Sequence, residues 1–241
     1  MSDDADPRAT PKGDIPGAGP GEPASVASQT KLTLTKQRWA REGKFLTGRV
    51  ARPESDRLPP GQHLVRDWPV LDLGMQPRIP LESWRLDVTG AVEHPVSWDW
   101  TAFRAQKQTR ETTDIHCVTT WSRYDNRWEG LATRDLLDAV MPREDAHFVM
   151  LHSYDGYTTN LALEDFAAED ALIVHSWEGK PLTIEHGGPA RLVVPHLYFW
   201  KSAKWIKKIE FRSFDKRGFW EENGYHNHAD PWLEERYSAD E

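Results

Sequence analysis

Residues 185–205 read EHGGPARLVVPHLYFWKSAKW and combine a buried-strand pattern with the composition of a ligand-binding loop. Leu192 to Val194 is a short apolar run rich in β-branched residues, which fits a strand buried in a sheet. Gly187 and Gly188 precede this run, and two glycines let a backbone approach a ligand closely. His186 can donate a hydrogen bond to ring nitrogens or oxygens. We therefore expect a sheet that carries a binding loop here.

Basic residues follow at once. Five of them fall within 12 residues, with Glu210 the only acid among them: Lys201, Lys204, Lys207, Lys208 and Arg212. One interpretation is a charged strand face exposed to solvent. The other is an anion site, where Lys and Arg neutralise a ligand's charge and Arg adds a planar fork. The neighbouring His-Gly-Gly turn favours the anion site.

The rest of the chain predicts an α+β fold that is rich in strands and forms one domain. The alternation of Trp84, Leu86, Val88 and Val92 with polar or small residues predicts a half-buried strand. Further strands are predicted for Phe148 to Leu151, Leu172 to Val174 and Ile206 to Phe211. Short helices are predicted from a Thr101 cap to about Gln106, and from Arg134 to Val140 before Pro142.

Three regions are expected along the chain. Residues 1–30 are predicted to be disordered, because five Pro and four Gly between Pro7 and Pro23 leave almost nothing to bury. Residues 31–58 form a basic arm, and residues 59–241 form the domain. Its end, residues 221–241, holds seven acidic residues and one Arg among several aromatic residues. We expect this tail to wrap back over the body, because aromatic residues at that density are seldom left exposed.

Composition narrows the classes of function. The formal net charge of −8 argues against general nucleic-acid binding. No stretch approaches the roughly 20 apolar residues of a membrane helix. The acidic start of the chain resembles neither a secretory nor a twin-arginine signal. The cytoplasm is therefore the expected location, and it suits an unpaired thiol.

That thiol is Cys117, the one cysteine of the chain, in the run Asp114-Ile115-His116-Cys117-Val118-Thr119-Thr120-Trp121-Ser122. A single cysteine in a chain is core filler, a nucleophile or a metal ligand. A soft thiolate suits a soft or redox-active metal. One cysteine cannot build a tetrahedral zinc site, so a metal bound here must bring its own ligands.

Two further groups leave alternatives open. Arg66, in the run His63-Leu64-Val65-Arg66-Asp67-Trp68-Pro69, is by itself an ordinary surface arginine. His226 and His228 form an H-x-H pair that could bind zinc, although no third ligand lies nearby in the sequence. Tyr225 is a candidate hydrogen-bond donor in a pocket, or else a packing residue.

These pieces occur in the order and spacing of the sulfite oxidase superfamily, which the chain resembles from about His63 to Trp232. The densest likeness is carried by Trp177-Glu178-Gly179-Lys180-Pro181-Leu182, His186-Gly187-Gly188-Pro189-Ala190-Arg191, Val193-Val194-Pro195 and Ser202-Ala203-Lys204-Trp205. It is similar to the family pattern N-G-x-P-L, H-G-x-P-x-R, V-V-P, S-x-K-W. The whole chain is most similar to the small, stand-alone bacterial sulfite oxidase-like oxidoreductases.

The resemblance implies a strand-rich molybdopterin-binding domain with Mo-molybdopterin as its cofactor. It implies that Cys117 is the protein ligand of molybdenum, and that Arg66 and Tyr225 face the active site. The cofactor contacts that it implies are Leu64, Val65, Arg66, Asp67, Trp68, His186, Arg191, Ser202, Ala203 and Lys204. A further contact is expected from Leu151 to Tyr157, with His152 favoured.

Two departures bear on the substrate. Sulfite oxidases carry an arginine shortly after the cysteine, where this chain has Ser122, and an acid before the active-site tyrosine, where it has Gly224. We expect a molybdenum-dependent oxidoreductase that transfers an oxygen atom to or from sulfur or another heteroatom of a small molecule. No haem, flavin or iron–sulfur motif is visible, so a separate protein would donate or accept the electrons. The alternative is a molybdopterin-binding or carrier protein without turnover.

Overall fold

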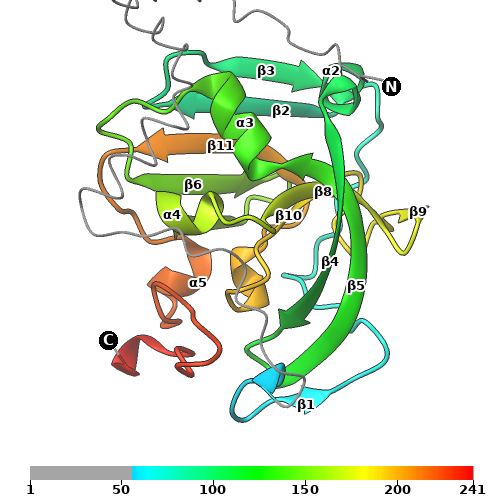
Figure 1. Cartoon of the computed structure of the whole chain (residues 1–241), viewed down its shortest axis with the longest axis vertical. Coiled ribbons are helices and arrows are strands. Elements are labelled where there is room, and N and C mark those ends of the chain that lie inside the picture. Colours follow the sequence, from blue (N-terminus) through cyan, green and yellow to red (C-terminus); the bar gives the residue numbers. More distant parts are fainter. Residues whose placement is uncertain (1–55, 241) are drawn as a thin grey trace, which may run out of the picture.

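The computed structural model describes residues 56–240, which form two β-sheets with short helices between their strands (Figure 1). The predictions for residues 1–30, and for the basic arm up to residue 55, concern residues outside the described range. The strand-rich mixture of sheets and few helices is the predicted class of fold.

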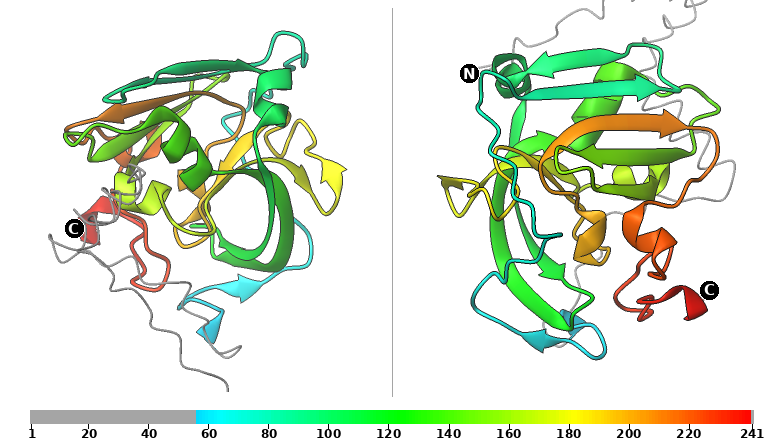
Figure 2. Two further views of the ribbon diagram at one scale, coloured as in Figure 1. Left: turned by 45° about the horizontal axis from the view of Figure 1, so that its top comes forward. Right: turned by 180° about the vertical axis from the view of Figure 1, so that it is seen from behind.

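The first sheet has the order β1-β5-β8-β10, with β4 paired to β5 and β9 paired to β8. Its strands are β1 (His63–Leu64), β4 (Gln108–His116), β5 (Trp121–Ala132), β8 (Leu172–Trp177), β9 (Lys180–Pro181) and β10 (Arg191–Val193). β4 and β5 form a long, curved antiparallel hairpin that extends away from the second sheet, and β1 pairs with the start of β5 (Figures 1 and 2).

The second sheet has the order β3-β2-β11-β6-β7. Its strands are β2 (Arg85–Gly90), β3 (Val96–Asp99), β6 (Phe148–Ser153), β7 (Thr158–Ala162) and β11 (Ile206–Arg212). The remaining elements are α2 (Trp100–Ala105), α3 (Thr133–Val140), α4 (Leu163–Phe166), α5 (Phe219–Glu222) and the 3-10 turns η2 (Phe199–Lys201) and η3 (Ser238–Asp240).

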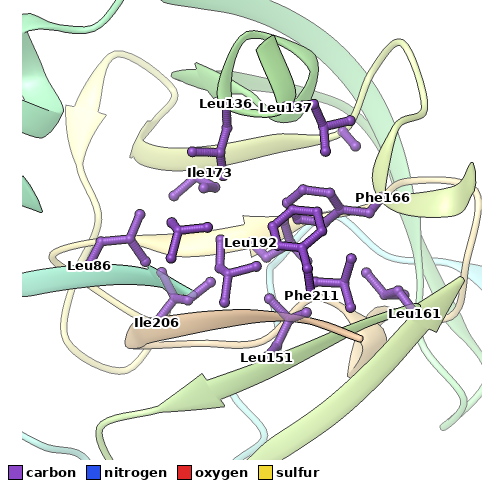
Figure 3. Close-up of a cluster of buried hydrophobic side chains, with 14 of the residues drawn as sticks. Leu86, Leu136, Leu137, Leu151, Leu161, Phe166, Ile173, Leu192, Ile206 and Phe211 are labelled. Carbon is purple, nitrogen blue, oxygen red and sulfur yellow. The ribbon is translucent and has the colours of Figure 1, made fainter. Parts of the chain in front are cut away.

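Two apolar cores lie on either side of the central strands of the first sheet. Ile173 of β8 and Leu192 of β10 belong to the main core, which the second sheet, α3 and α4 complete (Figure 3). Leu172, Val174 and Val193 from the same strands belong to a second core, which also contains Cys117. Because β8 and β10 bury residues on both faces, their sequences are continuously apolar and not alternating.

The predicted strands are confirmed as β2, β6, β8, β10 and β11, and the second predicted helix is confirmed as α3. The first helix exists as α2, but its predicted cap is wrong. Asp99 caps it, because Asp99 Oδ1 accepts a hydrogen bond from the Ala102 N–H (2.8 Å). Thr101 lies inside the first turn, one residue after the helix begins at Trp100. The capping side chain must precede the first helical residue.

The C-terminal tail packs against the rest of the chain. Trp232 Nε1 donates to Asp56 O (3.3 Å), and the Trp232 ring makes an edge contact with His116, 4.8 Å between centroids. His116 is the last residue of β4, directly before Cys117. The tail therefore lies beside the cysteine.

Candidate active site

Cys117 lies in the turn between β4 and β5. Its backbone N–H donates to Trp121 O (2.8 Å), and the Thr120 N–H returns a bond to Cys117 O (3.0 Å). Gln62 Nε2 also donates to Cys117 O (3.0 Å). Thr120 has a positive φ of 75°, which closes the turn. The thiol is thus held by a rigid backbone loop at the end of the long hairpin.

A cavity of about 360 Å³ opens beside this turn, and the Cys117 side chain lines it. The largest group of residues in its wall is aromatic: Trp68, Trp121, Tyr157, Phe199, Trp200, Trp205, Trp220 and Tyr225. Arg191, Ser202, Ala203 and Lys204 line the same cavity. The fold therefore brings together the turn after β4, the start of β10 and the segment after η2, which are far apart in the sequence.

Arg191 is a buried cation. Only 2% of its surface is exposed, and its guanidinium donates to three backbone carbonyls: those of His186 (3.0 Å), Leu192 (3.3 Å) and Ser202 (2.6 Å). Within residues 56–240 it forms no ion pair with a carboxylate. Burial lowers the pKa of Arg191 to about 9. A buried charge without a counter-ion is costly, so this position fits an anionic ligand.

Lys204 adds a second cation to the cavity. Its Nζ donates to Glu185 O (2.7 Å), and burial together with the Arg191 charge lowers its pKa to about 8.

The fold divides the basic cluster of the sequence into residues with different surroundings. Lys201 is buried in an ion pair with Glu221, while Lys208 and Arg212 pair with Glu210 on β11. Of the five basic residues, Lys204 alone lines the cavity.

The two glycines of the His-Gly-Gly turn have a packing role. A Cβ at Gly187, whose φ is 101°, would meet Lys204 Cβ at 3.0 Å, and one at Gly188 would meet Leu182 O at 2.4 Å. The sequence suggested that these glycines let the backbone approach a ligand closely. In the structure their backbone instead lies close to Lys204 and Leu182 of the chain itself. Because Gly187 packs on Lys204, it fixes the lysine beside the cavity.

His186 supports the wall of the cavity from behind. Its ring stacks on Trp68 with centroids 4.0 Å apart, and its Nε2 lies 3.1 Å from Trp68 O. A carbonyl can only accept, so Nε2 carries the proton and Nδ1 accepts from the Thr183 hydroxyl (2.9 Å). Burial lowers the pKa of His186, in keeping with a neutral ring. His186 is next to the cavity but does not line it.

Tyr225 comes to the cavity from the tail. Its ring stacks on Trp220 and meets Trp200 edge-on, each at 4.9 Å between centroids. Burial raises the pKa of Tyr225, so the phenol stays protonated at neutral pH and can donate. Tyr225 thus lines the cavity with a residue that can act as a hydrogen-bond donor.

Several predicted contacts do not reach the cavity. Of the segment from Leu64 to Trp68, only Trp68 lines it; Leu64, Arg66 and Asp67 are exposed, and Val65 packs against the second core. The Arg66 backbone carbonyl accepts a bond from Arg123 Nε (3.1 Å). The assignment of Arg66 to the substrate therefore has no support from the geometry.

His152 lies on β6 and is also outside the cavity. Its Nε2 is 3.3 Å from Glu210 Oε2 of the neighbouring strand β11. The segment that was expected to supply a contact does so through other residues, because Asp155 and Tyr157 line the cavity. They follow the end of β6, where the chain turns at Gly156.

The histidine pair of the tail already has partners. His226 Nδ1 accepts from the backbone N–H groups of His228 (3.1 Å) and Ala229 (3.2 Å). His228 Nδ1 binds Glu235 Oε2 at 2.8 Å. Over the part of the chain that the structure describes, no group of three His, Cys, Asp or Glu side chains is placed to hold a metal ion. This arrangement therefore does not support a zinc site at His226 and His228.

Thr119 is a cavity residue that the sequence reasoning missed. Its Oγ1 lies 3.2 Å from Cys117 Sγ. Together, the thiol, the two cations and the aromatic wall suit a flat, anionic organic group that brings a metal to Cys117. Mo-molybdopterin has these properties, and the uncompensated charge of Arg191 is the observation that it fits.

No helix among the described residues is long and apolar enough to cross a membrane. Several known proteins are similar to this chain in sequence. The oxidoreductase YuiH of Bacillus subtilis (strain 168), itself called uncharacterized, is 45% identical over 188 residues, which cover 78% of this chain and 95% of that protein. The protein-methionine-sulfoxide reductase catalytic subunit MsrP of Campylobacter jejuni is 29% identical over 178 residues, covering 62% of this chain and 58% of that protein.

Among solved structures, the sulfane dehydrogenase SoxCD from Paracoccus pantotrophus matches with a TM-score of 0.55 at 16% identity. The match covers 65% of this chain and 46% of that one, and at this identity it shows the fold alone. The family described as "Oxidoreductase molybdopterin binding domain" matches residues 73–220, more than half of the chain. The chain therefore belongs to the family of oxidoreductases with a molybdopterin-binding domain, and its cofactor is Mo-molybdopterin.

Proposed function

We propose that this oxidoreductase transfers an oxygen atom to or from sulfur or another heteroatom of a small molecule, with Cys117 as the protein ligand of molybdenum. The observation that carries the proposal is that one cavity is lined by the single thiol of the chain and by a buried arginine that has no counter-ion among residues 56–240. A soft thiolate suits the metal, and the two cations suit the charge of the cofactor.

When bound, the cofactor supplies the two-electron redox chemistry. The residues of the chain have distinct tasks. Arg191 and Lys204 hold the anionic part, and Ser202 and Ala203 supply the wall between them. The aromatic wall excludes water from the reacting atoms. The Tyr225 hydroxyl donates a hydrogen bond to the oxygen of the substrate. Arg66 has no part in this scheme, because its side chain is exposed.

The electrons would pass to or from a separate protein, since the chain shows no motif for a second redox group. We retain the cytoplasm as the proposed location, because the chain has a single cysteine and so needs no oxidising compartment to form a disulfide of its own. The carrier alternative is disfavoured because the family consists of oxidoreductases. Tyr225, which lines the cavity from the tail, would also have no purpose in a carrier.

Metal analysis tests the assignment of Cys117. Protein produced with molybdate should contain roughly one molybdenum atom per chain and little zinc, and Cys117→Ser should lose the visible absorption of the thiolate–metal bond and all turnover while keeping its fold. Thr120→Ser is the matched control, because it changes a hydroxyl residue of the same turn that does not line the cavity. Unchanged absorption and activity in Cys117→Ser would refute the assignment.

A further inference from the structure

Arg236, near the end of the chain, reaches back to the turn that carries Cys117. One guanidinium nitrogen donates to Val118 O at 2.8 Å, and the other donates to Pro60 O at 3.3 Å. The guanidinium lies over the Tyr198 ring, 4.9 Å from its centroid. The side chain thus connects the residue after the cysteine with the start of the domain and with the second core.

The backbone of the tail fixes Arg236 in this position. The Arg236 carbonyl accepts from the His226 N–H (3.2 Å), and the Ser238 N–H donates to Gly224 O (3.0 Å). Between these two bonds Tyr225 and Tyr237 form an antiparallel bridge. The same short ladder that presents Tyr225 to the cavity therefore presents Arg236 to the cysteine turn.

The charge of Arg236 is not compensated by an ion pair within the described range. The two hydrogen bonds of its guanidinium go to neutral carbonyls, and it makes no salt bridge with a carboxylate of residues 56–240. Val118 directly follows Cys117 and lines the cavity, whereas Arg236, which binds the Val118 carbonyl, does not line it.

We propose that Arg236 is a positioning residue for Cys117, which holds the cysteine turn through the Val118 carbonyl and sets the electrostatic potential at the sulfur. The inference rests on the proposed function, in which Cys117 binds molybdenum. It makes the C-terminal tail part of the active site on two counts, through Tyr225 in the cavity and Arg236 behind it. A fixed positive charge stabilises the more reduced, more negative state of a nearby metal.

Three variants separate the hydrogen bond from the charge. Arg236→Gln keeps a donor for Val118 O without the charge, Arg236→Lys keeps the charge and a donor, and Arg236→Met removes both. Arg134→Gln is the control. Arg134 Nε also donates to a backbone carbonyl, that of Ala167 at 2.7 Å, but it lies outside the cavity lining.

The readouts are the molybdenum content, the visible absorption of the thiolate–metal bond and the midpoint potential of the metal. We expect a negative shift of the potential in Arg236→Gln, a larger one in Arg236→Met, and recovery of most of the shift in Arg236→Lys. Arg134→Gln should match the wild type. Loss of molybdenum in Arg236→Met that Arg236→Lys restores would also support the proposal.

An unchanged potential and absorption in Arg236→Gln and Arg236→Met would overturn the inference, as would an equal shift in Arg134→Gln. Loss of molybdenum from Arg236→Lys and Arg236→Met alike would overturn the role of the charge. The proposed function fails separately, if Cys117→Ser keeps the absorption of the wild type. A protein with Cys117 confirmed as ligand and with an unaffected Arg236→Gln would refute this inference alone.

Discussion

Lys201 and Glu221 form an ion pair, Nζ to Oε1 2.7 Å, with both side chains completely buried. The pair joins four segments. Lys201 Nζ also donates to Asn160 O (3.0 Å) and Asn227 O (2.6 Å), and Glu221 Oε1 also accepts from Trp200 Nε1 (2.9 Å). Because Trp200 lines the cavity and Glu221 follows Trp220 in α5, the pair holds part of the aromatic wall in place.

Removal of one partner should therefore be more damaging than removal of both. Lys201→Met leaves the Glu221 carboxylate buried and unpaired, at a cost of about 3–5 kcal/mol in the free energy of unfolding. The double variant Lys201→Met/Glu221→Gln should recover much of this loss. Urea denaturation of the wild type, the single variants Lys201→Met and Glu221→Gln, and the double variant measures both effects. Additive losses in the double variant would show that the two charges do not interact as a pair.

The sequence predicted the strands β6, β8 and β10, because a continuous apolar run needs no knowledge of the partners, and alternation predicted β2. The long strands β4 and β5 were not predicted, because polar residues are frequent along them. The direction of individual side chains was harder to predict from the sequence. His152 was chosen from the right segment, yet it lies on β6 beside Glu210, while the cavity receives Asp155 and Tyr157 after the strand ends. Arg66 has the spacing of a family motif, but spacing alone does not determine where a side chain points.

Contacts between distant segments could not be predicted either, because local sequence patterns do not determine which side chains meet across the fold. Arg236 binds the carbonyl of Val118 across 118 positions of sequence, and no local pattern marks that pair. The basic cluster was interpreted either as a charged strand face or as an anion site, and each interpretation fits some of its residues. Side chains alternate along β11, so Lys208 and Arg212 lie on the same face as Glu210 and form ion pairs with it. Lys204 precedes the strand and lines the cavity.

Arg191→Ala and Lys204→Ala should each lower the cofactor content of the purified protein. The expected cost is about 1.5–3 kcal/mol for a lost hydrogen bond to a charged group, and more if the anion stays buried. Lys207→Ala is the matched control, because Lys207 belongs to the same basic run but does not line the cavity. Full molybdopterin content in both cavity variants would show that neither cation holds the cofactor.

The retention of cofactor should depend on pH through Lys204. Its pKa of about 8 means that the cavity loses a cation as the pH rises through that value, so an anion is held less tightly above it. Dialysis between about pH 7 and about pH 9.5, followed by metal analysis, should show falling retention, with a weaker dependence in Lys204→Ala. Retention that rises with pH would contradict the assignment.

The stability of the apoprotein should depend on pH with the opposite sign to the retention of cofactor. The pKa of Lys204 in the folded protein lies below its ordinary value of 10.5, so the unfolded chain holds the proton more tightly. Its contribution to the free energy of unfolding therefore increases as the pH rises from about 8 towards 10.5. Comparison of the apoprotein with Lys204→Ala in urea isolates this contribution.

Thr119→Val should change the spectrum of the metal site without loss of metal. The Thr119 hydroxyl lies 3.2 Å from Cys117 Sγ, and a hydrogen bond to a thiolate withdraws electron density from it. Without this bond the sulfur becomes a stronger donor, so its charge-transfer absorption should move to longer wavelength. Thr119→Ser should restore the wild-type spectrum. Identical spectra in all three proteins would mean that the Thr119 hydroxyl does not bond to the sulfur of the metal-bound protein.

Sulfite should be a poor substrate, because the cavity has few cations to offer a dianion. Arg191 and Lys204 are the Lys and Arg residues in its lining, and in the proposed function both hold the cofactor. Arg123 does not supply a third, since its Nε binds Arg66 O and its guanidinium lies over Trp177, 4.8 Å from the ring centroid. Ser122, at the position of the family arginine, is buried and bonded to His116 Nδ1 (2.8 Å).

An aromatic wall without a free cation favours a neutral polar oxide over a doubly charged oxyanion. We therefore expect weak oxidation of sulfite and faster turnover of a sulfoxide or an N-oxide. Two assays on molybdenum-loaded protein decide the matter: sulfite with an artificial acceptor, and a panel of oxides with reduced viologen. Efficient oxidation of sulfite at micromolar concentrations would overturn this prediction. It would require Arg191 or Lys204 to face the substrate, and Arg191→Ala and Lys204→Ala would then raise the KM for sulfite while the molybdenum content stayed unchanged.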